Sequence, residues 1–478
     1  MQLAVKVEAV AGSVVQPRSS VGWVLASLAL CMLLPSLGTS SANVALPTLA
    51  EAFAASFQQV QWVVLAYLLA TTTSIVSVGR LGDMVGRRRL LMAGIALFTA
   101  ASALCGVATS LGLLIAARAA QGFGAAAMLA LTMAFVGDAV PKSRTGSAMG
   151  LLGTLSAVGT ALGPTLGGVL IARFGWQAIF FVNIPLGVLA LVLAARHLPV
   201  DRPSSNARRP RFDHPGTLLL ALTLAAYALA MTIGRGRFGS VNLALFVAAA
   251  GGVALFVRVE ARAASPLIPL ARLRDPVLRA GLVMSALVST VMMATLVVGP
   301  FHLARALGLA PALVGLVMSA GPAIAALTGV PAGRGVDRYG AQHMTVGGLG
   351  AMVLGCLMLC LSPASLGIAG YVGPSIIVTA GYALLQAANN TAVMAEVAAD
   401  QRGVVSGMLN LSRNLGLVTG ASAMGAVFAF ATHARDLTVA TADAIALGMR
   451  VTFGVAAALL AVALVVALGN RPASRSTF

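Results

Sequence analysis

The chain has 478 residues, of which 59% are hydrophobic and only 9% are Asp, Glu, Lys or Arg, and its mean hydropathy is +0.95. Soluble domains are about half apolar and about a quarter charged, so this composition excludes an ordinary water-soluble fold. The net charge of +18 would suggest nucleic acid in a soluble protein, but arginines in the short cytoplasmic loops of a membrane protein explain it equally well. We therefore expect the lipid bilayer, and no nucleic acid, as a partner.

Long apolar runs without polar alternation predict transmembrane helices. A bilayer core about 30 Å thick needs about 20 apolar residues per helix, and only helices or closed barrels satisfy their backbone in lipid. The first run follows Lys6 and Arg18 as a signal peptide would, but it is too long for one, and many similar runs follow. In chain order, fourteen spans are predicted near residues 21–46, 60–79, 90–108, 111–137, 146–172, 176–196, 214–234, 241–258, 277–301, 312–331, 344–362, 368–394, 403–430 and 449–469.

The distribution of basic residues predicts the orientation. With the N-terminus in the cytoplasm, the cytoplasmic segments hold 23 of the 31 lysines and arginines, as the positive-inside rule requires. The predicted outer loops hold six, namely Arg173, Arg235, Arg237, Arg305, Arg435 and Arg450. Because the number of spans is even, both termini are expected on the cytoplasmic side.

Two pairs of matching stretches indicate an internal repeat. "GRLGDMVGRRR" at 79–89 and "GRGVDRYG" at 333–340 align at a displacement of 254, and two glycine-rich stretches, at 150–163 and 407–420, align at 257. Six spans are too short for this displacement, and the surplus accommodates an inserted pair of helices. We therefore expect parallel six-helix halves at 1–196 and 277–478, with linkers and two inserted helices at 197–276. Each charged stretch is interpreted as the cytoplasmic turn between the second and third helices of its half.

These motifs resemble those of the major facilitator superfamily. "GRLGDMVGRRR" resembles its signature loop, "RAAQGFGAA" resembles its R-x-x-x-G-x-G pattern, and "GTALGPTLGG" resembles the G-x-x-x-G-P-x-x-G-G motif of its antiporters. "FDHPGTLLLAL" and "SPLIPLARL", which flank the inserted pair, resemble the fourteen-span drug:proton antiporter family. The resemblance implies an all-α integral membrane protein of the bacterial inner membrane that exports small amphipathic substrates by alternating access, with protons as the coupling ion and no cofactor.

The resemblance and the polar residues within spans together name three groups of candidate residues. The gating loop, expected to latch the halves on the cytoplasmic side, comprises Gly79, Arg80, Asp83, Gly86, Arg87, Arg88, Gly333, Asp337, Arg338 and Gly340. Substrate binding or coupling is assigned to Arg118, Gln121, Asn43, Asn389, Asn390 and Arg413. The antiporter motif, in which small residues let helices approach closely and a proline bends the helix, comprises Gly159, Gly163, Pro164, Gly167 and Gly168.

Structural interpretations of the same residues remain open. An arginine within the membrane suggests function by default, but Arg118 can equally be a structural residue bonded to backbone carbonyls. Arg413 aligns with Ser156 across the repeat, which predicts that it faces the central cavity. Asn389 and Asn390 either line that cavity or join neighbouring helices.

The sequence departs from the antiporter pattern in its first span. Family members commonly carry an aspartate where "LGTSSANVALP" places Gly38, and the chain's thirteen acids all fall near helix ends or in loops. Proton coupling would then depend on another group: Glu51, Asp83, Asp138 or Glu396, or Arg118 displacing a substrate's charge. Two intramembrane arginines without an embedded acid favour anionic, zwitterionic or neutral substrates over permanent cations.

Other classes of protein find less support. The four cysteines (Cys31, Cys105, Cys356 and Cys360) lie in apolar runs and imply neither a disulfide framework nor a metal site. All five histidines fall at loops or helix ends, which disfavours a membrane enzyme, and the lack of an ATP-binding motif disfavours a primary pump. A transporter of one endogenous metabolite, in either direction, and a solute sensor remain alternatives.

Overall fold

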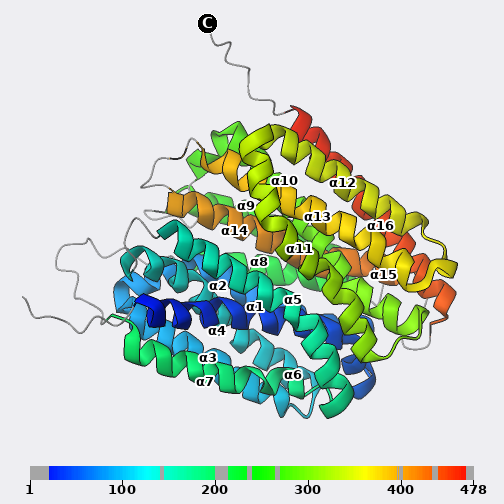
Figure 1. Ribbon diagram of the computed structural model, residues 1–478, viewed down its shortest axis with the longest axis horizontal. Helices are drawn as coiled ribbons and strands as arrows, with labels where there is room; N and C mark the ends of the chain where they lie inside the picture. Colours follow the sequence, from blue (N-terminus) through cyan, green and yellow to red (C-terminus); the bar gives the residue numbers. More distant parts are fainter. Residues whose placement is uncertain are drawn as a thin grey trace, which may run out of the picture.

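The computed structural model describes residues 21–139, 145–199, 214–233, 239–263, 270–395, 397, 402–432 and 440–469. All regular secondary structure in these ranges is helical, and the long helices run roughly side by side in two groups (Figure 1). The first group comprises α1 (Val21–Ala52), α2 (Phe57–Val85), α3 (Arg87–Gly106), α4 (Leu111–Ala139), α5 (Thr145–Phe174), α6 (Ala178–Phe181) and α7 (Asn183–His197).

The second group follows a helical pair, α8 (His214–Thr232) and α9 (Ser240–Glu260). It comprises the 3₁₀ turn η2 (Leu270–Arg274), α10 (Pro276–Phe301), the π-helix η3 (His302–Ala306), α11 (Pro311–Tyr339), α12 (Ala341–Leu361), the 3₁₀ turn η4 (Ala364–Leu366), α13 (Gly367–Met394), α14 (Arg402–Thr419), the π-helix η5 (Gly420–Met424), α15 (Gly425–Ala431) and α16 (Ala442–Gly469).

The two groups repeat the same packing pattern. In the first group α1 packs against α5 and α7, while α4 packs against α2 and α3. In the second group α10 packs against α14 and α16, while α13 packs against α11 and α12. Helices at equivalent places in the two repeats therefore have equivalent neighbours, as an internal duplication requires.

Equivalent glycines make the equivalent close contacts. A Cβ atom on Gly124 would lie 2.7 Å from the carbonyl oxygen of Gly94 in α3, and one on Gly381 would lie 2.6 Å from that of Gly348 in α12. Gly381 follows Gly124 by 257 residues and Gly348 follows Gly94 by 254 residues, and these are the two displacements of the sequence alignment. At both crossings the two backbones touch and leave no room for a side chain, so these positions require small residues.

The pair α8 and α9 packs beside α2 and α14 and contacts both groups (Figure 1). Trp62 of α2 donates its indole N–H to Thr232 Oγ1 in α8 at 3.1 Å, and Ser77 Oγ lies 2.7 Å from Thr217 Oγ1. A small apolar cluster joins the pair to α14 and contains Leu220, Leu224, Phe256 and Leu411. The inserted helices are thus attached along the side of the bundle.

Twelve helices in the described ranges are long and apolar enough to cross a bilayer. The other two predicted spans correspond to α2 and α5, which are not among these twelve; in α5 the apolar stretch within the described residues is Val158–Phe174. The count of fourteen spans is therefore not confirmed and stays a prediction, as do the domain boundaries.

Several predicted boundaries need correction. The charged stretch expected as a loop at 79–91 is mostly helical, because α2 continues to Val85 and α3 begins at Arg87. The predicted span 176–196 is interrupted at Val182, and the span 403–430 contains the π-helix η5. Arg450, expected in an outer loop, lies within α16 and donates to Ser362 O at 3.2 Å. The guanidinium of Arg450 thus caps a carbonyl at the C-terminal end of α12, where a positive charge is favourable.

Candidate functional site

We call the end of the bundle that holds the α2–α3 and α11–α12 turns the motif end. Each of these turns consists of a single glycine, Gly86 with φ 108° and Gly340 with φ 82°. Each donates its N–H to the carbonyl four residues earlier, at 2.9 Å in both cases. Positive φ is accessible to glycine at little cost. The two turns therefore have the same backbone geometry.

The side chains around the two turns differ in their surroundings. Arg88 donates to Ala195 O of α7 at 2.5 Å, so it ties α3 to its own half. Asp337 and Arg338 are exposed, and the Arg338 guanidinium lies 5.3 Å from the ring centre of Tyr339. The side chains of Arg80 and Asp83 lie outside the described part of the structure. The latch between halves stays a prediction.

Three glycines of the antiporter motif form the crossing of α5 with α1. A Cβ atom on Gly159 would lie 2.6 Å from Leu33 O, and one on Gly163 would lie 1.8 Å from Ser40 Oγ. Gly167 of α5 likewise faces Ser41 of α1. In the second half, Gly416 and Gly420 meet the backbone of α10 in the same way. This part of the motif therefore serves packing within a half.

The remaining positions of the motif join the two halves. A Cβ atom on Gly168 in α5 would lie 3.0 Å from the Cα atom of Gly315 in α11, and one on Gly315 would lie 2.2 Å from Pro164 O. Proline at 164 also leaves a carbonyl in the preceding turn without its usual partner. The helices of different halves thus touch backbone to backbone here. We call the end nearer this contact, which also holds the α1–α2 turn, the opposite end.

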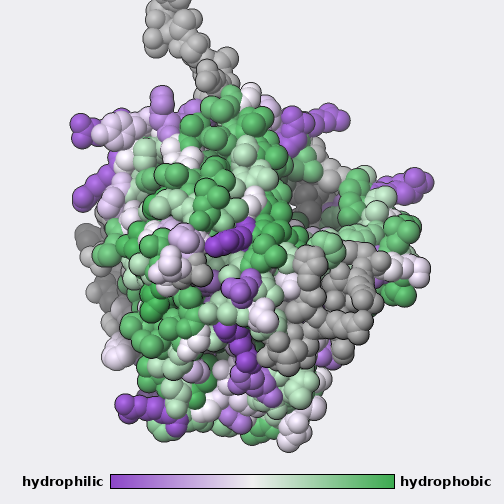
Figure 2. Space-filling model, turned by 90° about the vertical axis from the view of Figure 1, so that its right-hand side faces the viewer, coloured by the Kyte–Doolittle hydropathy of each residue, from purple (hydrophilic) through white to green (hydrophobic). Residues whose placement is uncertain are grey.

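Polar and aromatic contacts reinforce the junction at the opposite end. Glu51, at the end of α1, forms an ion pair with Arg305 of η3 at 2.5 Å. Phe57 packs edge-on against Phe301, with ring centres 4.7 Å apart. Gln61 donates to the carbonyl of a residue in η5 at 2.9 Å. Figure 2 shows this face of the molecule, where hydrophilic residues cross the middle of a largely apolar surface.

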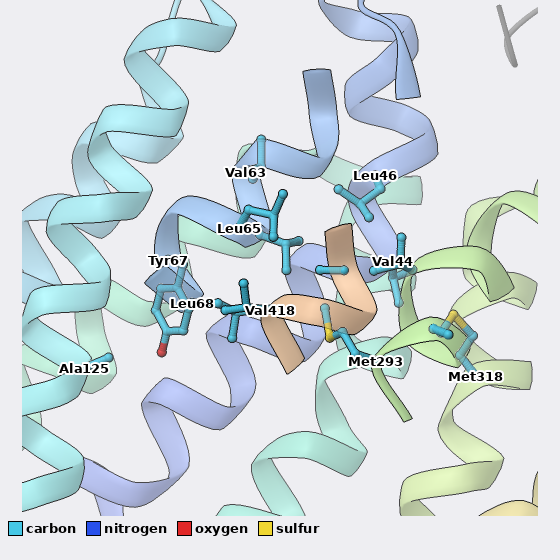
Figure 3. Close-up of a cluster of buried hydrophobic side chains, with 14 of the residues drawn as sticks. Val44, Leu46, Val63, Leu65, Tyr67, Leu68, Ala125, Met293, Met318 and Val418 are labelled. Carbon is cyan, nitrogen blue, oxygen red and sulfur yellow. The ribbon is translucent and has the colours of Figure 1, made fainter. Parts of the chain in front are cut away.

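A buried apolar layer lies beneath these contacts. Side chains of α1 and α2 from the first half and of α10, α11 and α14 from the second converge in it (Figure 3). Its labelled members include Val44, Leu46, Leu65, Leu68, Met293, Met318 and Val418. Methionine is flexible and fills irregular gaps, which suits a contact surface that forms and separates.

Arg118 is fully buried within the first half. Its Nε donates to Val63 O at 2.9 Å, and Nη1 donates to Gln121 Oε1 at 2.5 Å and lies 3.5 Å from Gly38 O. The guanidinium also lies 4.3 Å from the ring centre of Tyr67, within cation–π range. In this conformation Arg118 makes the carbonyl contacts of a structural arginine, and its role in substrate binding or coupling stays a prediction.

The glycines that follow Arg118 give it this position. A Cβ atom on Gly122 would lie 2.5 Å from the carbonyl oxygen of Tyr67 in α2, whereas Gly124 meets α3. The pattern R-x-x-x-G-x-G therefore allows α4 to approach two helices at once, and the arginine one turn earlier reaches the backbone of α2.

The other predicted polar residues lie in different surroundings. Asn43 is fully buried, and its amide has no hydrogen-bond partner among the described residues. Asn389 donates to Gly281 O of α10 at 3.1 Å, so it joins helices, whereas Asn390 is exposed. Arg413 is also exposed. Among the described residues, no hydrogen bond joins them to Arg118 or to one another.

Ser156, the repeat partner of Arg413, has its hydroxyl oxygen 2.7 Å from that of Ser36. This contact lies within the first half. On α14, Ser412 donates to Leu282 O at 2.6 Å, which anchors the helix to α10 beside the exposed Arg413. An exposed charge on a membrane-spanning helix fits a water-filled cavity better than lipid, and the place of Arg413 in a central cavity stays a prediction.

Sequence reasoning missed several residues of the site. Tyr67 and Ser102 complete the surroundings of Arg118, with Ser102 Oγ accepting from Gln121 Nε2 at 2.7 Å, and the Asn183 amide faces Gly38. Polar side chains inside apolar runs were a usable signal for Ser102 and Asn183. Arg305, counted only as a loop charge, is the partner of Glu51, and no sequence pattern links that pair.

Comparisons with known proteins agree with this architecture. The family model described as Major Facilitator Superfamily matches residues 28–421. Multidrug resistance protein Stp of Mycobacterium tuberculosis is 34% identical over 81% of this chain and 72% of its own length. Multidrug efflux pump LfrA of Mycolicibacterium smegmatis is 30% identical over 85% and 81%. Riboflavin transporter RibZ of Clostridioides difficile is 30% identical over 85% and 88%.

Solved structures share the fold at low sequence identity. A bacterial homologue of the human lysosomal transporter Spinster, in an inward-facing and unoccupied conformation, superposes with a TM-score of 0.68 at 16% identity and covers 95% of this chain and 97% of its own. The xylose transporter XylE of E. coli, in a partially occluded inward open conformation, gives a TM-score of 0.66 at 13% identity over 95% and 98%.

Proposed function

Because the chain belongs to the Major Facilitator Superfamily, we propose that it is a secondary transporter that exports small amphipathic compounds across the inner membrane of a bacterium by alternating access. Relatives named multidrug resistance or efflux proteins, each about one third identical over four fifths of the chain, support export. Antibiotic resistance is the corresponding phenotype.

One observation carries the proposal: where α5 and α11 cross between the halves near the opposite end, the two helices meet glycine against glycine. Gly168 and Gly315 bring two backbones together without interlocking side chains. Such a contact can separate as the halves rotate. By the arginine distribution, the motif end faces the cytoplasm, so substrate would enter there while the opposite end is shut.

The charge of the interior supports a substrate class. Arg118 is buried and Arg413 is exposed on α14, while position 38 in α1 lacks a carboxylate. A permanent cation entering between the halves would meet positive charge, with no acid paired to either arginine among the described residues. Anionic, zwitterionic and neutral amphipathic compounds are therefore the better substrates.

The pair formed by Glu51 and Arg305 supports proton coupling at the opposite end. It joins the halves, and the Glu51 side chain is 60% exposed, so a proton from solution can reach the carboxylate. Protonation would remove its negative charge and weaken the closed contact. On this proposal, the coupling group lies at the interface between the halves and not at the usual first-span position.

A transporter of one endogenous metabolite is the second candidate. The similarity to a protein named riboflavin transporter, over 85% of this chain, favours it specifically. The two candidates differ in selectivity: a multidrug exporter moves chemically unrelated compounds, whereas a metabolite transporter saturates with one and ignores the others.

Transport by the purified protein in liposomes tests both. Three fluorescent or radioactive probes are compared with and without an imposed proton gradient: ethidium as a permanent cation, a zwitterionic fluoroquinolone, and riboflavin as a neutral metabolite. Gradient-dependent movement of the fluoroquinolone with little movement of ethidium supports the proposal. Riboflavin transport alone supports the second candidate, and strong ethidium transport by the wild type refutes the proposed substrate class.

The Glu51→Gln variant examines the coupling step in the same liposomes. Loss of the response to the gradient, with downhill transport retained, supports coupling at this pair. An unchanged response excludes Glu51 as the coupling group.

A further inference from the structure

A cavity lies within the second half at the opposite end. Its lining comes from η3, the α12–α13 turn, α13 and α16, and includes His302, Ser362, Gly370, Ala446, Met449 and Arg450. Water can occupy about 20 Å³ inside it, slightly more than one molecule needs, and the free space is about 340 Å³ with the open mouth included. The cavity therefore admits one polar group of a molecule whose remainder stays outside.

The helices that border the cavity lie on the outside of the second half. Both α12 and α16 pack against each other and against other helices of that half, along one edge of the second group (Figure 1). Leu361, Leu366 and Leu447, each next in sequence to a residue of the lining, are exposed. Exposed apolar side chains that gather on one surface mark contact with a partner or a membrane. A molecule would therefore reach this cavity from the lipid side and not from between the halves.

Arg450 brings a positive charge to the cavity. Its Nη2 donates to Ser362 O at 3.2 Å, which is its one hydrogen bond among the described residues, and Ser362 also belongs to the lining. A guanidinium has five N–H donors, so others remain for a ligand. Asp443, the acid in the first turn of α16, lies seven residues earlier, about 10 Å along the helix axis, and is not paired with Arg450. A planar guanidinium suits phosphate, which it can bind through two parallel hydrogen bonds.

The rest of the lining offers further polar groups. The Nδ1 atom of His302 is buried and has no hydrogen-bond partner among the described residues, while the ring stacks on Tyr371 with the centres 6.3 Å apart. Ser362 Oγ is turned towards Gly370, since it would lie 2.4 Å from a Cβ atom placed there. A buried nitrogen without a partner is unfavourable. These groups favour a polar occupant over an acyl chain.

We propose that the cavity binds the phosphate-containing headgroup of a membrane phospholipid. Arg450 pairs with the phosphate at the mouth, one polar atom of the headgroup enters the enclosed part, and the acyl chains lie along the exposed apolar side of α12 and α16. A lipid fits better than free phosphate because the enclosed part is small and its surroundings are apolar. All residues of the lining belong to the second half, so this ligand is bound to the protein and is not the transported compound.

Thermal unfolding of the purified full-length protein tests the site without any transport substrate. The protein is washed free of lipid in dodecyl maltoside, and the Tm is measured at constant ionic strength and scan rate. Three probes are compared: dioctanoyl phosphatidylglycerol, dioctanoylglycerol with the same chains but no phosphate, and inorganic phosphate. A ligand at about 100 times its Kd shifts the unfolding equilibrium about 100-fold. We expect a saturable rise of several degrees in Tm with phosphatidylglycerol and little change with the other two.

Two variants assign the effect to the cavity. Arg450→Gln removes the charge, and Ala446→Leu fills the space while Arg450 remains, so both should lose the response to phosphatidylglycerol. Arg173→Gln is the matched control, because Arg173 is an exposed arginine in the last turn of α5 at the same end of the first half. It should respond like the wild type. Native mass spectrometry should count one fewer bound phosphatidylglycerol in each cavity variant than in the wild type and the control.

The proposal is overturned if dioctanoylglycerol raises the Tm as much as phosphatidylglycerol, which would show that only the chains matter. An equal rise with inorganic phosphate would identify a free anion and exclude the lipid. A wild-type response in Ala446→Leu would place the lipid elsewhere, and this variant decides if Arg450→Gln fails to fold. Failure to find a transported compound leaves these results unaffected, so this proposal and the proposed function fail separately.

Discussion

Replacing Gly315 by alanine should open the junction between the halves. The added Cβ atom would lie 2.2 Å from Pro164 O and 3.0 Å from the Cα atom of Gly168. Both neighbours are backbone atoms that cannot rotate away, so the two helices must separate by about 1 Å. Overpacking of this kind costs about 1–3 kcal/mol. If the cost falls only on the conformation in which α5 and α11 touch, the population of that conformation falls about 5- to 150-fold relative to the open one.

Electron spin resonance distances across the opposite end measure this shift. Spin labels at Phe174 and Ala442, both exposed and one in each half, are introduced after replacement of the native cysteines. Gly315→Ala should lengthen the distance distribution, whereas Gly329→Ala in the same helix, with no atom near its added Cβ, should not. A distribution for Gly315→Ala that matches the wild type would show that the glycine contact does not hold this end closed.

Three further substitutions give distinct outcomes. Gly86→Ala should destabilise the protein by about 1–3 kcal/mol because φ is 108° there, whereas Gly79→Ala, inside α2 with open space around it, should be neutral or slightly stabilising; equal Tm values would contradict the role of the turn. Arg118→Lys keeps the charge but loses the planar fork that reaches two helices, so a clear loss of Tm is expected, and an unchanged Tm would argue against a structural contribution. A double variant that exchanges the charges of Glu51 and Arg305 should restore gating better than either single reversal, because it keeps an ion pair at this place. The pair is partly exposed and worth about 0–1 kcal/mol, so the expected effect is small. A double variant no better than the single ones would show that the pair does not act as a unit.

The glycine pattern was the most informative part of the sequence. Its displacements of 254 and 257 predicted a duplication, and the crossings at Gly94 with Gly124 and at Gly348 with Gly381 follow the same two displacements. Backbone contacts require small residues at fixed places, so they leave a trace in one sequence. The single-residue turns at Gly86 and Gly340 belong to the same class.

Partners of polar side chains left no comparable trace. Arg118 was recognised as unusual from its place in an apolar run, but Tyr67 and Val63, which surround it, come from a helix more than fifty residues earlier. The ion pair of Glu51 with Arg305 joins residues 254 positions apart. Such contacts depend on which helix faces meet, and hydropathy is almost uniform around these helices.

Membrane embedding, helix positions and the duplication therefore follow from hydropathy and residue size, because lipid requires about 20 apolar residues for each crossing and close helix contacts require glycine. Only the fold decided which glycines of the antiporter motif contact their own half and which contact the other: Gly163 faces α1, and Gly168 faces the second half. Two glycines five positions apart point to different sides of a helix with 3.6 residues per turn, and only the packed structure shows what stands on each side.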